Sequence, residues 1–276
     1  MFRLDHVTVA GAALEPLRRA LAAVGIATVY GGTHQDGATE MAMVSFPDGS
    51  YLELIALHPD ATANAAGNHP WSRFLTGNAG PCAWAVSTGD LESEAGRLRA
   101  CGIAVGEALA NGRDRTDGVR LEWRTAAPGA GAAGSFFPFL IQDVTARDLR
   151  AFPKSAPDNR DFRGISRVVL AVRSIDSAIA RYRQAYGTAP SAKQDDAAFG
   201  AHLAVPGAAP VVFAQPLASD SWLAARLDRF GESPCAILLE AAGPWRSGAA
   251  AESRWFDTRI GWFDSGVLGW RLGWCG

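Results

Sequence analysis

The sequence predicts an α+β fold of four consecutive units, each consisting of a strand, a helix and a hairpin, grouped in two pairs. Three observations predict it. The order strand, helix, hairpin recurs along the chain. The helix starts match, because Leu14-Glu15 is repeated as Leu91-Glu92 and Ile175-Asp176, and Pro81-Cys82-Ala83 reappears as Pro234-Cys235-Ala236.

The first unit is the clearest. Residues 4–9 have a strand pattern, and Leu14, Leu17, Leu21 and Val24 form the apolar stripe of a helix. A hairpin follows, with strands at residues 40–46 and 51–57 around the turn 47–50. One more strand is expected around residues 27–30, which gives the order β-α-β-β-β.

The second and third units repeat this order. Strands are predicted at residues 82–86, 119–124 and 136–142, with a helix that begins after Asp90 and ends at Cys101-Gly102. In the third unit a strand at 167–172 precedes a helix capped by Ser174 and ended by Gly187. Its hairpin joins residues 201–205 to 211–215.

The fourth unit begins at Cys235 and is a truncated copy, because no helix pattern occurs between Leu239 and Ser253 and the chain finishes in short aromatic strands. Residues 151–164 are polar and rich in turn residues, which predicts a domain boundary. We therefore expect two domains, 1–150 and 151–276. Since the first holds two complete units, it should fold by itself.

Composition excludes several classes of protein. The 276 residues carry 26 Lys and Arg against 28 Asp and Glu, and the Arg residues are scattered, which argues against a nucleic-acid partner. No run of about 20 apolar residues and no leader pattern is present, so we expect a cytoplasmic protein without a membrane partner. The four Cys lack the spacing of a zinc or redox motif. The expected partner is a small-molecule substrate, and a homodimer is left open.

The ordered motifs resemble the vicinal oxygen chelate superfamily, which includes glyoxalases, bleomycin resistance proteins and dioxygenases. The resemblance rests on residues 4–9 and 49–55 as the first and last strands of a unit. It sharpens to the glyoxalase-like branch through Gly31-Gly32-Thr33-His34, His69-Pro70-Trp71 and residues 113–118 and 136–142. This resemblance covers residues 1–150 and implies that paired βαβββ units form curved mixed sheets around a cleft.

Strand parity singles out His6 and Glu53. Val7 and Val9 can pack against the first helix, so His6 and Thr8 point to the other face, and Glu53 does the same on its strand. In the resembled superfamily a His and a Glu at these positions bind a divalent metal. Imidazole and carboxylate suit Zn, Mn, Fe, Co or Ni. The alternative is that His6 is a hydrogen-bonded structural residue.

Half of the ligand set that is usual in the superfamily is missing, because the other units lack the equivalent residues. The second unit has Ala83 in place of His6, or Cys82 if the register slips by one, and Phe139 in place of Glu53. The second pair has Arg167 and Phe213. His34 could supply the third ligand, because the flexible Gly31-Gly32 pair can bring its imidazole near the sheet. The alternative is an exposed loop residue. We expect residues 165–276 to be structural or to shape the cleft and an interface.

Substrate-binding residues are expected around the cleft. Residues 111–118 form a basic, turn-rich loop in which Arg113 and Arg115 could clamp a carboxylate or phosphate, unless they pair with the Asp residues of the same loop. Trp123 lies on the following strand, Gln142 stands where the branch often has an acidic residue, and Trp71 closes the cleft or packs in the core.

Two functions remain open from the sequence. The first is a metal-dependent, glyoxalase-like enzyme of lyase or isomerase type, acting on a small anionic oxygenated substrate, with Glu53 or His34 moving a proton. The second is a metal-free protein of the same fold that binds small molecules, as resistance proteins do. Fold resemblance does not choose between them.

Overall fold

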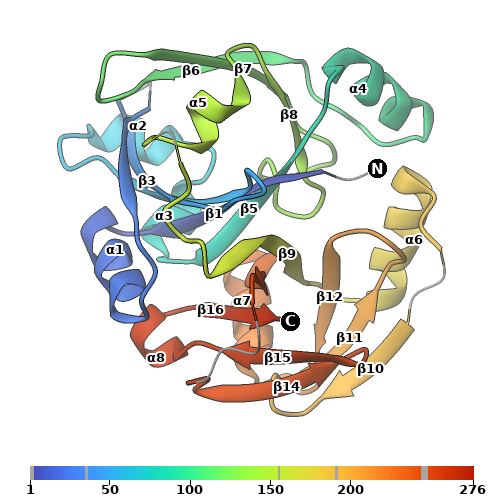
Figure 1. The fold of residues 1–276 in the computed structure, drawn as a ribbon. Coiled ribbons are helices and arrows are strands. Elements are labelled where there is room, and N and C mark those ends of the chain that lie inside the picture. Colours follow the sequence, from blue (N-terminus) through green and yellow to red (C-terminus); the bar gives the residue numbers. More distant parts are fainter. Residues whose placement is uncertain (1–2, 35–36, 155, 190–191, 244–247) are drawn as a thin grey trace.

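The computed structural model describes residues 3–34, 37–154, 156–189, 192–243 and 248–276 and confirms the predicted fold class. The chain forms two eight-stranded mixed sheets, one above the other in Figure 1. The strand orders are β2-β3-β4-β1-β5-β8-β7-β6 and β10-β11-β12-β9-β13-β16-β15-β14. Each sheet is therefore a pair of four-stranded units, joined where β1 meets β5 and β9 meets β13 in antiparallel pairs.

The strands of the first sheet are β1 (Leu4–Gly11), β2 (Val29–Thr33), β3 (Thr39–Ser45), β4 (Tyr51–Leu57), β5 (Gly80–Ser87), β6 (Leu109–Asp114), β7 (Arg120–Ala126) and β8 (Phe139–Asp143). Those of the second are β9 (Phe162–Ala171), β10 (Ala192–Asp196), β11 (Ala201–Val205), β12 (Val211–Pro216), β13 (Ser233–Ala241), β14 (Ala251–Trp255), β15 (Thr258–Trp262) and β16 (Arg271–Cys275). The helices are α1 (Leu14–Ala23), α2 (Ala63–Asn68), α3 (Ser72–Thr76), α4 (Leu91–Ala100), α5 (Arg147–Ala151), α6 (Ile175–Tyr186), α7 (Trp222–Phe230) and α8 (Ser265–Leu268).

Local sequence explains where the long helices begin and end. The Asp90 carboxylate accepts a hydrogen bond from the Ser93 amide at the start of α4, and the Ser174 hydroxyl does the same for Ser177 in α6. Helix α6 ends at Gly187, which has a φ of 62° that glycine adopts without steric cost. These caps are the ones that the sequence predicts.

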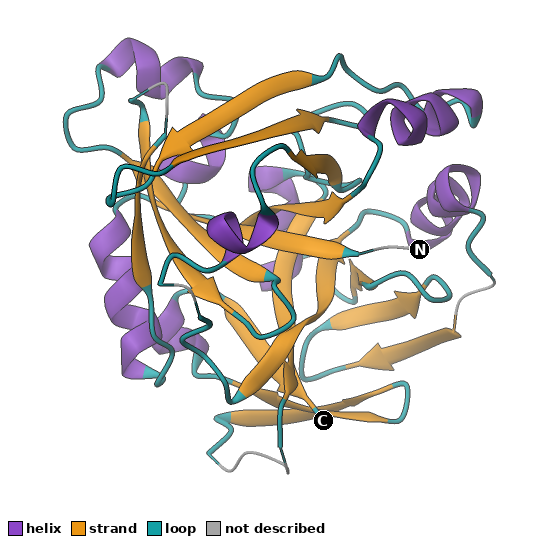
Figure 2. Ribbon diagram, turned by 45° about the horizontal axis from the view of Figure 1, so that its top comes forward, coloured by secondary structure: helices purple, strands orange, loops and turns teal. Residues whose placement is uncertain are grey.

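The helix-covered faces of both sheets share one apolar core. Val7 and Val9 of β1 and Val168 and Leu170 of β9 belong to the same buried cluster, which also contains Trp270. Strand β5 lies against β13. Figure 2 shows helices at the left and right edges of the molecule and others near its centre. Since the helix-covered faces meet, the concave faces of the two sheets point away from each other.

Several elements differ from the expectation, and the helices α2, α3, α5 and α7 were not predicted. The predicted loop 111–118 is partly strand, because Asn111–Asp114 belong to β6, and β10 was not expected either. The fourth unit keeps four strands, so it is shorter only because it lacks the helix after its first strand. The described residues between β13 and β14 contain no helix, and the short α8 lies between β15 and β16. Residues 244–247 lie outside the described part.

Helix α5 spans the predicted boundary at residues 150 and 151 and lies between the last strand of the first sheet and the first strand of the second. Within the described residues, no helix is long and apolar enough to cross a membrane.

Candidate functional site

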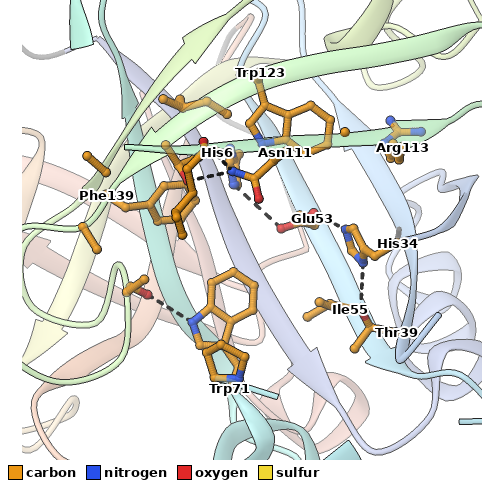
Figure 3. A pocket seen from close by; sticks show the side chains of 18 of the residues that line it. His6, His34, Thr39, Glu53, Ile55, Trp71, Asn111, Arg113, Trp123 and Phe139 are labelled. Atoms are coloured by element: carbon orange, nitrogen blue, oxygen red, sulfur yellow. Dashed lines mark hydrogen bonds and ion pairs between the residues drawn. The ribbon is translucent and has the colours of Figure 1, made fainter. Parts of the chain in front are cut away.

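The concave face of the first sheet encloses a cavity of about 710 Å³. Its histidine and carboxylate groups lie on β1, β4 and the β2–β3 connection, its arginines come from β6 and α5, and aromatic and aliphatic side chains form its walls (Figure 3). A cavity of this size, mostly apolar with a few convergent polar groups, is typical of small-molecule sites. The lining includes His6, His34, Glu53, Trp71, Arg113, Trp123, Phe139 and Arg150.

The Glu53 carboxylate lies between two imidazoles. His6 Nε2 is 3.7 Å from Glu53 Oε2, and His34 Nε2 is 3.4 Å from Glu53 Oε1. The Thr8 hydroxyl also donates a hydrogen bond to Oε2, at 3.1 Å. The structure therefore brings together the three residues that the sequence predicts as ligands (Figure 3).

Each imidazole is held by its other nitrogen. His6 Nδ1 is 2.7 Å from the Asp5 carboxylate, and His34 Nδ1 is 2.8 Å from the Thr39 hydroxyl. An ionised carboxylate can only accept, so His6 donates its Nδ1 proton to Asp5 and its Nε2 faces the cavity. Both rings are thus oriented by a neighbouring side chain.

Asp5 reaches His6 because β1 is irregular there. Leu4 pairs with Val86 and His6 with Ala85, so the register shifts by one residue at Asp5. In a regular strand two successive side chains point to opposite faces, whereas a bulge re-aims one of them. Asp5 is completely buried.

Arg150 anchors Asp5. Its guanidinium donates two hydrogen bonds of 2.9 Å to Asp5, two to Asp143 at 2.6 and 3.1 Å, and one of 2.7 Å to the Tyr51 hydroxyl. All five N–H groups of Arg150 are therefore used. Arg147 also pairs with Asp5. The Tyr51 ring stacks on His6 at 4.8 Å, so Arg150 holds both neighbours of that imidazole.

These contacts set the charges of the carboxylates. Burial raises the pKa of Glu53, but the hydrogen bond from His34, the charges of His6 and His34 and the Thr8 hydroxyl outweigh it and bring the pKa to about 2. Burial also raises the pKa of Asp5, but Arg150 and His6 hold it well below its usual value. Both carboxylates are ionised at neutral pH.

Arg113 lies at the polar end of the cavity and is only 2% exposed. Its Nη1 donates to the Gly31 carbonyl at 2.6 Å, a contact between the edge strands β6 and β2 that nearly closes the sheet. Its Nη2 contacts the Met43 sulfur at 3.5 Å. No carboxylate of the described residues lies within ion-pair distance, and burial lowers the pKa of Arg113.

Two residues predicted to bind substrate lie elsewhere. Arg115 does not line the cavity: it pairs with Asp117 at 2.7 Å and donates to the Leu149 and Pro153 carbonyls, which ties down the segment around α5. Gln142 faces α4, where its side chain accepts from the Leu91 amide and donates to the Gly89 carbonyl.

Comparison with the third unit explains the role of Gln142. Gln215 accepts from the Ile175 amide in the same way in the third unit, so this position ties the last strand to the start of the helix. Parity separates it from its neighbours, because Phe139 and Ile141 of the same strand line the cavity. Gln142 is therefore a helix-anchoring residue, and the prediction overlooked which face of β8 it occupies.

The aromatic wall of the cavity contains both tryptophans that the sequence analysis placed near the cleft. Trp71 and Trp123 both line the cavity, and Trp71 donates its indole N–H to the Ala133 carbonyl at 3.1 Å. Its ring lies 6.4 Å from Phe139 and 5.9 Å from His69. Asn111 also faces the cavity and donates to the Thr125 hydroxyl at 2.9 Å.

The donor types of His6, His34 and Glu53 suit a divalent metal, but their arrangement does not form a metal centre. Each imidazole approaches a different carboxylate oxygen. Among the described residues, no group of three His, Cys, Asp or Glu side chains is placed to hold an ion. The three predicted ligands meet as an ion-pair cluster.

The other units lack these groups, as expected. Thr8 pairs with Glu53 and Ala85 with Phe139, so Phe139 occupies the place of Glu53 in the second unit. In the third unit Val169 pairs with Val212, which corrects the expected Phe213: Val212 holds that position, and Phe213 faces the shared core.

Sequence reasoning missed Asp5, Tyr51 and Arg150. The signal for Asp5 was its place beside His6, but a bulge cannot be read from strand parity. Arg150 lies 145 positions from its Asp5 partner, and α5 is too short to give a periodic pattern.

The fold and its polar cavity define a protein of the vicinal oxygen chelate class. The chain belongs to the glyoxalase-like domain family, whose model matches residues 4–186. A comparison with curated proteins found no match.

Solved structures resemble the whole chain. A hypothetical protein from Staphylococcus aureus is 12% identical over 99% of both chains, with a TM-score of 0.68. A mutant of 4-hydroxymandelate synthase from Streptomyces coelicolor is 12% identical over 99% of this chain and 92% of that one, with a TM-score of 0.59. At these identities the likeness concerns the fold alone.

Proposed function

We propose that the first-sheet cavity is the active site of an enzyme that moves a proton at a small, oxygenated, anionic substrate, in a reaction of the lyase or isomerase type. The observation that carries the proposal is the Glu53 carboxylate flanked by His6 and His34 in a largely apolar cavity. A positioned base with oriented imidazoles beside it is what proton transfer at carbon or oxygen requires.

The base would be Glu53, and its strength depends on His34. The contact with His34 does most to lower the pKa of Glu53. A substrate oxygen that takes up the His34 N–H would remove this contact and raise that pKa, which makes the carboxylate a better base. His34 would then donate to the substrate oxygen while Glu53 accepts the proton. His6, fixed by Asp5, keeps its Nε2 toward the same carboxylate.

Arg113 supports an anionic substrate. It is a buried cation with no carboxylate of the described residues within ion-pair distance, and two of its five N–H groups contact the Gly31 carbonyl and the Met43 sulfur. A substrate carboxylate or phosphate could accept from the remaining groups, and such charge-assisted bonds are strong when shielded from water. Trp71, Trp123 and Phe139 would cover its apolar part.

A metal-dependent form of this enzyme is the second candidate. The observation in its favour is that His6 and His34 are each oriented through the second ring nitrogen, as metal-ligating imidazoles are. Because the present arrangement does not fit an ion, we derive no step through a metal. Elemental analysis of protein purified without chelator, and assays with added Zn, Mn, Fe, Co or Ni, separate the two forms.

The test is deuterium incorporation. The full-length protein is incubated in D₂O with a panel of 2-oxo and 2-hydroxy carboxylates and phosphorylated hydroxyketones, and loss of carbon-bound hydrogen is followed by proton NMR. We expect exchange with at least one compound and a loss of about 100-fold or more in Glu53→Gln. Glu240→Gln, an exposed Glu of the second sheet, should retain it.

One result would favour the metal-free binding protein instead. If compounds raise the melting temperature of the wild-type protein but no exchange occurs with or without added metal, the cavity binds small molecules and does not transform them. His6→Ala and Glu53→Gln would then change affinity only.

A further inference from the structure

A second polar cavity lies between the two domains, away from the first-sheet cavity. It has a volume of about 360 Å³. One wall is formed by residues 77–79, which follow α3 in the first domain, and the others by α7 and by the segment from α8 to the start of β16 in the second domain. We call this cavity the interdomain groove.

Three arginines line the groove, and no Asp or Glu does. Arg226 and Arg229 lie on the same face of α7 at a spacing of three residues, and Arg271 begins β16. Three like charges around one cavity repel each other unless something neutralises them.

None of these arginines has a carboxylate of the described residues within ion-pair distance, and only the more distant charge of Asp196 acts on Arg271. Arg226 donates to the carbonyls of Ala79, Pro81 and Pro234, and so ties the two repeated Pro-Cys-Ala segments together. The Arg271 guanidinium lies 4.3 Å from the ring centre of Trp222, and the Arg229 guanidinium lies 5.0 Å from that of Phe230. Burial lowers the pKa of Arg226 and of Arg271.

Two buried donors of residues that line the groove have no hydrogen-bond partner among the described residues. These are Nε of Arg226 and the indole Nε1 of Trp270, which is 7% exposed and packs over Gly80 of the first domain. A buried donor without an acceptor costs free energy, so such donors in native proteins call for an explanation. Unpaired donors and arginines without an ion-pair partner are both groups that a bound anion would satisfy.

We infer that the interdomain groove binds a doubly charged oxyanion, a phosphate group or a dicarboxylate. Several oxygens of one dianion could accept from Arg271, Arg229 and the Trp270 indole, because Arg presents a fork of donors that matches such groups. The ligand would contact both domains at once and so stabilise their association. This inference does not rest on the function proposed for the first-sheet cavity.

The experiment follows the Trp270 indole signal directly. Protein labelled with ¹⁵N at its tryptophan indoles is titrated with inorganic phosphate, with malonate and, at matched ionic strength, with sodium chloride. Trp270→Phe assigns the signal. We expect a saturable shift with phosphate, malonate or both, none with chloride, and roughly tenfold weaker binding in Arg271→Gln. The two ligands show whether a phosphate or a dicarboxylate is preferred.

Two control variants locate the site. Arg259→Gln removes the same charge from β15, where Arg259 pairs with Glu252, and should titrate like the wild type. Arg113→Gln should also leave the Trp270 shift unchanged, which separates the groove from the first-sheet cavity. If Arg271→Gln misfolds, Arg229→Gln on the exposed face of α7 takes its place. No shift with either dianion, or equal affinity in the groove variants and Arg259→Gln, would overturn the inference.

Discussion

The two sheets have the same strand order, but the concave face of the first is partly polar and that of the second is filled by aromatic side chains. In the first sheet His6 and Glu53 face a cavity, and their equivalents in the third unit are Arg167 and Val212. Phe199, Trp255 and Trp262 fill the second concave face with stacked and edge-on aromatic contacts. A cavity of about 260 Å³ remains there, against about 710 Å³ in the first sheet.

The difference separates what folds the chain from what could give it a function. The helix-covered faces are apolar in all four units and merge into one core, so these positions serve the fold. The concave positions contribute less to that core and are free to differ. The first sheet has buried charges, which are costly unless paired and are common at functional sites.

Separating the two sheets should have the largest effect on the stability of the first sheet. The sequence predicts that residues 1–150 fold alone, but the shared core means that a chain cut after residue 154 exposes Val7, Val9 and their neighbours. We expect this fragment to aggregate or to bind a hydrophobic dye and to lack a cooperative thermal transition. A sharp transition with dispersed NMR signals would show that each domain is independent.

Removal of Arg150 should destabilise the first sheet strongly. Arg150→Met leaves the buried carboxylate of Asp5 with Arg147 as its only arginine, beside His6 Nδ1, and breaking a buried ion pair costs about 3–5 kcal/mol. The free energy of unfolding is measured by urea denaturation. Arg167→Met in the second sheet is the matched control and should cost far less, because Arg167 is half-buried and makes one long contact with the Ala209 carbonyl. Equal losses would show that the Asp5 network is not special.

Much of the fold, and part of this network, could be predicted from the sequence. Periodicity located the long helices because their apolar stripes repeat every three to four residues, as in Leu14, Leu17 and Leu21. Edge strands such as β6 were missed because Asn111, Gly112 and Asp114 favour turns, and their strand pairing with β7 is a tertiary effect. Strand parity correctly placed His6 and Glu53 on one face of the sheet. It could not predict the contacts of Asp5, which depend on a bulge, or those of Arg150, which depend on α5.

Acid should destabilise the first sheet through its carboxylates. Folding lowers the pKa of Glu53 from 4.5 to about 2, so the contribution of this group to stability is present above pH 4.5 and is lost as the pH falls toward 2. The loss is on the order of 3 kcal/mol for Glu53, and Asp5 adds to it in the same direction. Urea denaturation between pH 6 and pH 3 should show a smaller dependence in Glu53→Gln. An unchanged slope in this variant would mean that the Glu53 contacts do not stabilise the fold.

The smallest effect, and the sharpest for the comparison, concerns the two arginines of one hairpin. Arg113 faces the cavity, whereas Arg115 pairs with Asp117 outside it. For any carboxylate ligand found in a thermal-shift screen, Arg113→Gln should lose about 1.5–3 kcal/mol of binding free energy and Arg115→Gln less than about 0.5 kcal/mol. Because Arg113 also bonds to Gly31 across the sheet edges, its removal could disturb the cavity as a whole. The amide analogue of the same ligand resolves this. If the charge of Arg113 matters, the variant should bind the amide as well as the wild type does. A loss for both ligands would instead assign Arg113 to closing the sheet, and the first concave face would then owe its specificity to the aromatic wall.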